Sequence, residues 1–255
     1  MATISAPDGG ITTTSYRAIR YGRLTIVKDP AGHARQTTTD ALGRVTAVAE
    51  DATGSNLATQ YGYDPMGNLV WVNKCAASGC GSGQSCSFTY DSLGGLTSAT
   101  NPESGATSYS YDPSGNLKTK TDARGIVATY SYDALNRLTG KTYSDGVTSN
   151  VSYTWDPALA NGIGRLGSVA NGSGVMNYTG YDAMGRVTQS NQQTPSYYYN
   201  FSYSYDLAGA LTSETYPSGR VLRTAYDGAG RPTGINGTLG STATNYVSPF
   251  PNGVE

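Results

Sequence analysis

The chain has 255 residues, a formal net charge of −1 and only 14% charged residues. This balance argues against a nucleic-acid partner or attachment to an anionic membrane, both of which favour a basic surface. No apolar run reaches the 18 residues typical of a membrane-spanning helix, so we expect no transmembrane span. Sparse aliphatic residues would favour disorder at high net charge, but here the charge is near zero and a regular strand pattern predicts a folded chain.

One pattern recurs along the chain: an aromatic residue, Asp, two further residues, Gly, one residue, then Leu or Val. The predicted turn residues are, in chain order, Asp40, Gly43, Asp64, Gly67, Asp91, Gly94, Asp112, Gly115, Asp133, Asn136, Asp156, Asp182, Gly185, Asp206, Gly209, Asp227 and Gly230. The aromatic residues that precede them form a predicted ladder on one face: Tyr63, Tyr90, Tyr111, Tyr132, Trp155, Tyr181, Tyr205 and Tyr226. A pattern that recurs at intervals of 20 to 50 residues indicates a repeat architecture.

The copy from Tyr109 to Thr119 shows why the pattern predicts a hairpin. Aromatic and small polar residues alternate up to Tyr111, as in a half-buried strand. The Asp112 carboxylate can accept the backbone N–H two residues on, and Pro113 fixes φ for the next turn position. Gly115 supplies the positive φ at which a type I turn runs into a bulge.

The turn aspartates lie 21 to 27 residues apart, and 21 is the commonest spacing. At Asn136 the Gly position holds the other residue that tolerates a left-handed backbone. The copy at Trp155 reaches its Gly164-Arg165-Leu166 exit about five residues late. Counting by 21 finds worn copies at both ends, with Ile19 and Ser248 at the Asp position. We therefore expect a single array over residues 1–255 that is a segment of a longer protein.

Second turns lie between the copies, about 13 residues after each Asp, as at Asp29-Pro30-Ala31-Gly32 and Asp122-Ala123-Arg124-Gly125. Each unit is thus two short strands, and about ten units predict roughly 20 strands, or a sheet on the order of 100 Å long. Open twisted sheets of that size curl, split or close. The sequence predicts an all-β fold, a repetitive array of antiparallel hairpins that curls into a spiral or a partial hollow β-shell.

Three cysteines, Cys75, Cys80 and Cys86, lie in a copy with a Gly/Ser-rich insertion from Ala76 to Ser85. Their spacing is not that of a zinc site, and no His lies nearby. One local disulfide in an exported protein is a plausible use of them, with one thiol left over and the pairing open.

Other candidate sites have plainer explanations. A ladder of Asp residues could bind Ca²⁺, but the nonapeptide calcium pattern is absent and turn chemistry accounts for each Asp. His33 is the single His, so a Ser-His or His-metal site is hard to build. The run from Tyr197 to Phe201 could bind a sugar or a partner, although strand packing explains it more simply. We expect no catalytic residue, metal or cofactor.

The repeated frame resembles the Tyr-Asp (YD) repeat of the RHS and teneurin family over nearly the whole chain. The Tyr-Asp pairs and exits such as Gly43-Arg44-Val45-Thr46 and Gly185-Arg186-Val187-Thr188 carry the resemblance. It implies hairpins wrapped into a spiralling, hollow β-shell, which encloses a C-terminal effector in bacterial toxins and is a rigid adhesion scaffold in teneurins. The aspartyl autocleavage core of the toxins and an unrelated effector are not seen here, so enclosure is implied only for a longer parent protein.

Three functions follow as hypotheses. The first is a non-catalytic shell segment of a secreted or cell-surface bacterial protein, with the rest of the parent chain or its effector as partner. The second is an extracellular adhesion or fibre element, since two exposed edge strands are templates for self-association. The third, a hydrolase, would need an activity that a single Asp-to-Asn change abolishes. The sequence from Met1 to Ala6 lacks the features of a signal peptide, so an export signal would lie outside this chain.

Overall fold

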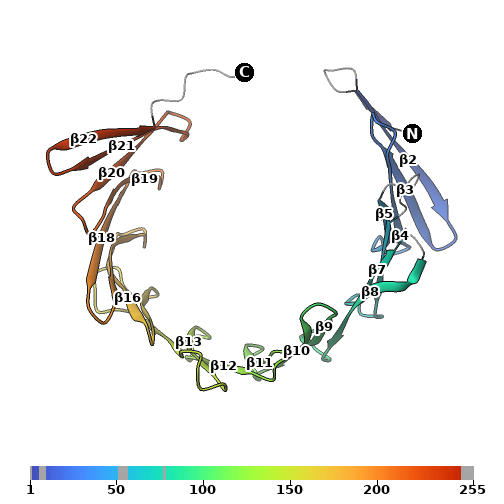
Figure 1. Ribbon diagram of the computed structural model, residues 1–255, viewed down its shortest axis with the longest axis horizontal. Helices are drawn as coiled ribbons and strands as arrows, with labels where there is room; N and C mark the ends of the chain where they lie inside the picture. Colours follow the sequence, from blue (N-terminus) through green and yellow to red (C-terminus); the bar gives the residue numbers. More distant parts are fainter. Residues whose placement is uncertain (1, 6–9, 51–56, 77–78, 248–255) are drawn as a thin grey trace. The chain divides into compact units, whose positions relative to one another are not determined.

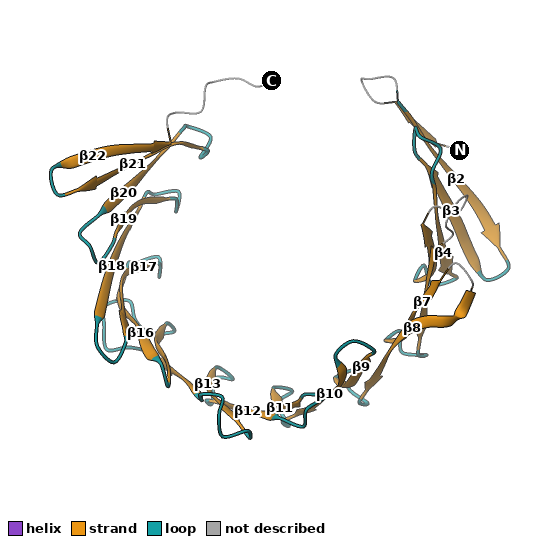
Figure 2. Cartoon of the chain, viewed as in Figure 1, coloured by secondary structure: helices purple, strands orange, loops and turns teal. Residues whose placement is uncertain are grey.

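The structure is a computed structural model that describes residues 2–5, 10–50, 57–76 and 79–247, with the side chains of residues 5, 76 and 79–83 left outside the description. Within these ranges the chain contains 22 strands, joined by turns, and no helix (Figure 2). The predicted all-β array of antiparallel hairpins is confirmed. The strands divide into two compact units, Met1–Val127 and Ala128–Glu255.

Unit 1 contains eleven of the strands. They are β1 (Ala2–Ser5), β2 (Ile11–Ile19), β3 (Gly22–Lys28), β4 (Ala34–Asp40), β5 (Val45–Glu50), β6 (Leu57–Tyr63), β7 (Leu69–Ala76), β8 (Gly79–Tyr90), β9 (Leu96–Asn101), β10 (Gly105–Tyr111) and β11 (Leu117–Thr121). Each strand from β1 to β10 pairs antiparallel with the next strand along the chain.

Unit 2 contains the other eleven, the first of which begins at the last residue of unit 1. They are β12 (Val127–Tyr132), β13 (Leu138–Tyr143), β14 (Val151–Trp155), β15 (Leu166–Asn171), β16 (Gly174–Tyr181), β17 (Val187–Gln193), β18 (Tyr198–Tyr205), β19 (Leu211–Thr215), β20 (Val221–Tyr226), β21 (Pro232–Leu239) and β22 (Thr242–Val247). Each strand from β12 to β21 again pairs antiparallel with the next. Figure 1 shows the strands of each unit following one another in sequence order along a curved sheet.

The register shifts by one residue where a strand enters a Tyr-Asp turn. Between β10 and β11, for example, Ser110 lies opposite Thr119 whereas Tyr111 lies opposite Leu117. Such a bulge increases the local twist of the strand pair. Because the Tyr-Asp turns repeat, the same local distortion recurs along each unit.

The first worn copy forms a tighter turn than the five-residue turns of the other copies. Ile19 at the end of β2 pairs directly with Gly22 at the start of β3, so Arg20 and Tyr21 alone make the connection. The position that holds Asp in the other copies holds Ile19 here, and an apolar side chain cannot accept the backbone N–H groups that shape the longer turn.

The sheet has very little buried core among the described residues. Apart from glycines, the buried residues of the described ranges are Ala34, Cys75, Ala128 and Ser190, and none of the large side chains there is fully buried. Many large apolar side chains, such as Leu93 and Leu207, are almost fully exposed. A single layer of this kind depends on contacts between neighbouring hairpins, as in other repeat proteins.

Candidate functional site: the Tyr-Asp turns and the joints between them

Seven Tyr-Asp turns and the turn at Asp40, where Thr39 stands in place of the aromatic residue, share one backbone geometry. In each of them the Asp N–H donates to the carbonyl four residues on, at 2.9–3.0 Å, and the residue three after Asp donates back to the Asp carbonyl, at 2.9–3.2 Å. That fourth turn residue has φ between 59° and 94°, and it is Gly in seven turns and Asn136 in the eighth. Only Gly, and less readily Asn, adopts this left-handed conformation without strain. The aspartates of these turns are Asp40, Asp64, Asp91, Asp112, Asp133, Asp182, Asp206 and Asp227.

The Asp carboxylate holds the turn together from inside. In the turn at Asp112, Oδ1 accepts the N–H of Ser114 and the N–H of Asn116, both at 2.9 Å. Oδ2 accepts the Asn116 side-chain amide at 3.1 Å. The carboxylate is thereby occupied by its own turn, so these aspartates act as structural acceptors.

The fifth turn residue differs between copies. It is Arg at 44, 137, 186 and 231, and each of these donates Nε to its own Asp at 2.6–2.8 Å. It is Asn at 68 and 116, where the side-chain amide makes the same contact at 2.9 and 3.1 Å. Gly95 and Ala210 have no side chain that could do so.

Aromatic side chains connect seven of the turns to the turn before. Tyr111 donates its hydroxyl to the carbonyl of Leu96, the exit residue of the preceding turn, at 3.0 Å. Trp155 does the same with its indole N–H, which donates to Leu138 at 2.8 Å. The same bond is made by Tyr63, Tyr90, Tyr181, Tyr205 and Tyr226, at 2.6–3.0 Å. The residues that we predicted as an aromatic ladder thus supply a repeated hydrogen bond as well as packing, and Tyr132 also has an interaction partner.

Three of the arginines also stack on the aromatic residue that precedes the next turn. We call each such pair an arginine joint. The guanidinium of Arg44 lies 4.8 Å from the ring centroid of Tyr63, and Nη1 of Arg44 donates to the Asp64 carbonyl at 3.4 Å. Arg186 stacks likewise on Tyr205 at 4.7 Å. The third joint pairs Arg137 with Trp155 at 5.0 Å. Each arginine therefore contacts its own turn and the next one.

The joint at Arg137 is the most elaborate. Its two terminal nitrogens donate to the two carboxylate oxygens of Asp156, at 3.0 and 2.7 Å, while Nε binds Asp133. Asp156 has φ of 57°, unlike the other turn aspartates, and its Oδ1 also accepts the N–H of Gly164 at 2.6 Å. A bidentate pair of this kind is among the stronger charge-assisted contacts. The long loop from Pro157 to Gly164 begins directly after this altered entry.

Contacts of this kind favour the charged forms of several turn groups, as the pKa values of four of them show. The Asn116 amide and then its backbone N–H hold the pKa of Asp112 below its ordinary value. At Asp133 the largest influence is the backbone N–H of Arg137, which again lowers the pKa. The Arg137 guanidinium, with the Gly164 N–H, lowers the pKa of Asp156 to about 2, and the two carboxylates raise the pKa of Arg137. Groups held so firmly in their charged forms are poor proton shuttles near neutral pH.

The remaining candidates lie as follows. His33 is exposed and its Nδ1 is 3.0 Å from Asp29 Oδ2, within one of the second turns. Among the described residues no three His, Cys, Asp or Glu side chains gather as a metal site would require. Cys75 is disulfide-bonded and Cys86 is a free thiol, whereas the side chain of Cys80 lies outside the description. No helix that could cross a membrane occurs in the described ranges.

The tyrosine run differs from the strand packing that we expected. It starts at a turn in which Thr194 donates its backbone N–H to the Tyr197 carbonyl, and Tyr198 begins β18. Tyr197 and Tyr198 are 64% and 66% exposed, and Tyr197 contacts Tyr199 with ring centroids 6.2 Å apart. A turn at the sheet margin has fewer neighbours to cover its rings.

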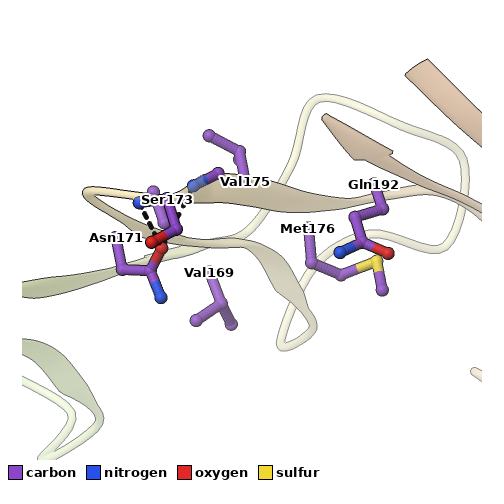
Figure 3. A pocket seen from close by; sticks show the side chains of 8 residues that line it. Val169, Asn171, Ser173, Val175, Met176 and Gln192 are labelled. Atoms are coloured by element: carbon purple, nitrogen blue, oxygen red, sulfur yellow. Dashed lines mark hydrogen bonds between the residues drawn. The ribbon is translucent and has the colours of Figure 1, made fainter. Parts of the chain in front are cut away.

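A hollow of about 290 Å³ lies at the hairpin of β15 and β16. Figure 3 shows Val169 and Met176 along it and the Asn171 carboxamide turned into the hairpin, where it accepts the N–H groups of Ser173 and Gly174. Asn171 is thus used by its own turn. The largely apolar lining offers no catalytic arrangement.

Sequence reasoning did not find the arginine joints. It recorded the Gly-Arg and Gly-Asn exits but gave the fifth residue no role. The signal was present, because Arg44, Arg137 and Arg186 each lie 18 or 19 residues before an aromatic residue that precedes Asp.

The RHS repeat family profile matches residues 40–70, 90–126, 111–148 and 205–242, which together cover about half of the chain. The chain belongs to the RHS-repeat family. The matched ranges contain Tyr-Asp turns with the geometry given above, so the family assignment and the structure rest on the same residues.

Solved structures share this fold. The RHS-repeat chain is similar to a chain of the TcdB2-TccC3-Cdc42 crystal structure, with a TM-score of 0.77, 16% identity and 98% of this chain covered. It is similar in the same way to a chain of the Photorhabdus luminescens Tc holotoxin pore, with a TM-score of 0.79 and 17% identity over 98% of its length. The chain spans only 15% and 14% of those two chains. No curated protein matches it.

Proposed function

We propose that this chain is a structural, non-catalytic segment of an RHS-repeat β-shell in a secreted or cell-surface bacterial protein. The observation that carries the proposal is the repeated connection between turns, in which seven aromatic residues each donate to the exit carbonyl of the preceding turn. These bonds use the side chains that a substrate site would need. Family membership supports the same role, since shell repeats work by enclosure.

In a longer parent protein, the proposal extends to enclosure of a C-terminal effector. Large apolar side chains at the turn tips of this single-layer sheet are exposed, which supports the presence of a partner that covers them. Leu42, Met66 and Leu93 are 77%, 70% and 92% exposed on successive Tyr-Asp turns of unit 1. The remainder of the parent chain is the partner that we propose for this surface.

Electron microscopy of the purified chain tests the scaffold role. We expect discrete curved or hollow particles of uniform size. Enclosure is tested in the parent protein by limited proteolysis, with the parent compared to a variant that carries Val at Gly43, Gly67 and Gly115. The C-terminal segment should be protected in the parent and digested in the variant. Equal digestion in both proteins would exclude enclosure.

A second candidate function is an extracellular adhesion or fibre element. It is favoured by the ends of the array, since in the described ranges β1 pairs only with β2, and β22 pairs only with β21. An open strand edge is a template for another chain, and head-to-tail pairing that does not close gives filaments. Long regular filaments whose length grows with protein concentration would support this function and contradict an isolated shell segment.

A further inference from the structure

One turn in unit 2 has the backbone of the Tyr-Asp turns but lacks their carboxylate. The Tyr216 N–H donates to the Arg220 carbonyl at 2.8 Å, and the Gly219 N–H donates back to the Tyr216 carbonyl at 2.9 Å. Gly219 has φ of 78°. Ten other turns of the described ranges have both of these bonds, and each of them begins with Asp. The turn from Tyr216 to Arg220 therefore keeps the frame and an Arg as its fifth residue, but Tyr replaces the Asp that accepts hydrogen bonds.

The side chain of Arg220 lacks the acceptor that its counterparts use. In the four Tyr-Asp turns with Arg as the fifth residue, Nε donates to the Asp of the same turn at 2.6–2.8 Å. Nε of Arg220 is shielded from solvent and has no hydrogen-bond partner. None of the ion pairs of the described ranges involves Arg220. Because a shielded donor without an acceptor is costly, this position favours an oxygen ligand.

Glu214 is an acidic side chain close to this turn, but Tyr216 engages it. The Tyr216 hydroxyl donates to Glu214 Oε2 at 2.9 Å, and this bond is the largest of the causes that raise the pKa of Tyr216. The Tyr216 ring packs edge-on against Phe201, with ring centroids 6.0 Å apart. The side chain at the Asp position thus binds Glu214 and leaves Arg220 without a carboxylate.

The guanidinium of Arg220 is held in place by an aromatic stack. It lies 4.4 Å from the ring centroid of Tyr246 on β22. A Cβ added at Gly237 of β21 would lie 2.5 Å from Cε2 of Tyr246, so the ring lies directly on the sheet at this glycine. Cation–π packing of this kind orients the guanidinium before a ligand arrives. A hollow of about 350 Å³, lined in part by Tyr216 and Gly219, gives a ligand access to the turn.

We propose that the turn from Tyr216 to Arg220 binds a carboxylate that the turn itself does not supply. The ligand group takes the position that Asp has in the other turns and accepts the Nε–H and a terminal N–H of the guanidinium. A planar carboxylate matches this edge of an arginine in bidentate geometry. A free carboxylic acid and an Asp or Glu side chain of a bound polypeptide share this chemistry, and their affinities for the turn distinguish them.

Nitrogen–proton correlation spectra of the arginine Nε–H groups, recorded as the chain is titrated with sodium acetate at constant ionic strength, test the proposal. Arg220→Lys identifies the Arg220 signal. We expect this signal to shift saturably with a Kd of about 10–100 mM, the range for one charge-assisted pair. The signals of Arg44, Arg137 and Arg186 are internal controls and should not shift, because each of these residues already donates Nε to its own Asp.

Two matched variants test whether the site is the missing Asp position. Y216D/E214Q supplies the carboxylate within the turn, so its acetate Kd should rise by about tenfold or more. Without acetate, its Arg220 signal should lie where that of the parent chain lies at saturation. Y216L/E214Q removes the same ring without adding an acceptor and should keep the Kd within about twofold of the parent. Both variants carry Glu214→Gln, so that no carboxylate released by the loss of Tyr216 reaches Arg220.

A blocked Gly-Asp-Gly tripeptide distinguishes the two sources of the carboxylate. A Kd about tenfold or more below that of acetate identifies a polypeptide side chain as the ligand, and a Kd equal to that of acetate identifies a free acid. No saturable shift of Arg220, an equal shift of the three control arginines, or an equal acetate Kd in Y216D/E214Q and Y216L/E214Q would each overturn the proposal. Because the readout is the Arg220 signal alone, none of these results bears on the scaffold role.

Discussion

The turn from Asp112 to Asn116 in unit 1 and the turn from Asp133 to Arg137 in unit 2 have the same backbone geometry. They differ in the contacts that the side chain of the fifth residue makes. In both, the Asp carboxylate accepts N–H groups two and four residues on. The Asn116 side chain donates to its own Asp, whereas Arg137 donates to its own Asp and also contacts Trp155 and Asp156 of the next turn. The formation of a turn and the connection between turns are therefore separate properties, set by different residues.

The comparison also explains how a sheet with so little core holds together. Every Tyr-Asp turn carries its own hydrogen-bonded ring, which needs no neighbour. The aromatic hydrogen bond then links most turns to the preceding one, and the arginine joints reinforce three of these links. The stability of a repeat array depends on the contacts between neighbouring repeats as well as on each repeat itself. Replacing turn-forming residues and turn-linking residues separately therefore measures how much each contributes to stability.

The largest loss is expected when the turn itself cannot form. Gly115 has φ of 82°, and a Cβ added there would meet no described atom within 4 Å. Gly115→Val should therefore cost roughly 1–3 kcal/mol from backbone strain alone, because a β-branched residue resists positive φ. Chemical unfolding followed by circular dichroism measures the loss. Gly115→Asn is the control and should lose far less, and if Val and Asn are equivalent the turn assignment fails.

The next largest effect should come from an arginine joint. Arg137→Ala removes charge-assisted bonds to Asp133 and Asp156, so its unfolding midpoint should fall further than that of Asn116→Ala, which removes the bond of a neutral amide to Asp112. Arg124→Ala is the matched control, because Arg124 is exposed and binds only Asp122 in its own turn. Hydrogen exchange should speed up at the Gly164 amide in Arg137→Ala alone. If Arg124→Ala lowers the midpoint as much as Arg137→Ala, the joint has no role in stability.

The same joint should give a pH signature. Asp156 has a folded pKa of about 2 against an ordinary value of 3.8. Its ionised form therefore stabilises the fold above pH 4, and this contribution is lost as the pH falls towards 2. The difference in midpoint between the parent and Arg137→Ala should be constant from pH 5 to pH 7 and shrink below pH 4. Added salt should reduce it at neutral pH, since Asp156 is partly exposed. A difference that grows on acidification would contradict the ion pair.

Much of the fold could be predicted because the repeated signals are local. Asp, Gly and their spacing act within five residues, so the turns, the hairpins and the approximate number of strands follow from the sequence. Asn136 could be placed for the same reason, and its φ is 59°. Counting by 21 placed a turn after Ile19, but its shorter form could not be predicted, because the spacing is kept while the Asp that shapes the longer turn is lost.

The arginine joints and the path of the long loop after Asp156 could not be predicted from local rules. An arginine joint depends on two turns lying side by side at a distance set by sheet register, which spacing alone does not give. The left-handed φ of Asp156 and the fold of Pro157 onto β15 depend on the partner Arg137 and on the bare surface of Gly167. The insertion was visible in the sequence, but the face that it would cover was not.

A smaller loss is expected from the hydrogen bond that links turns. Tyr205→Phe keeps the ring that stacks under Arg186 and removes only the bond to the Val187 carbonyl, which is 2.9 Å long. A neutral hydrogen bond of this kind contributes about 0.5–1.5 kcal/mol. Tyr198→Phe is the control, because its ring is largely exposed and it should leave the unfolding midpoint unchanged. A loss as large as that of Arg137→Ala would show that the hydroxyl, and not the arginine, dominates the link between turns.

The smallest effect should come from Asn136→Gly, which changes the turn residue and leaves the joint in place. Asn136 already has φ of 59°, and Gly adopts that conformation at no steric cost. The substitution should be neutral or stabilise the chain slightly, even though the neighbouring residue is Arg137. Equilibrium unfolding alongside Gly115→Asn measures the same exchange in the opposite direction. If Asn136→Gly lowers the midpoint strongly while Gly115→Asn does not, turn and joint are coupled at this copy, because its arginine would then need the stiffer Asn backbone to reach Asp156.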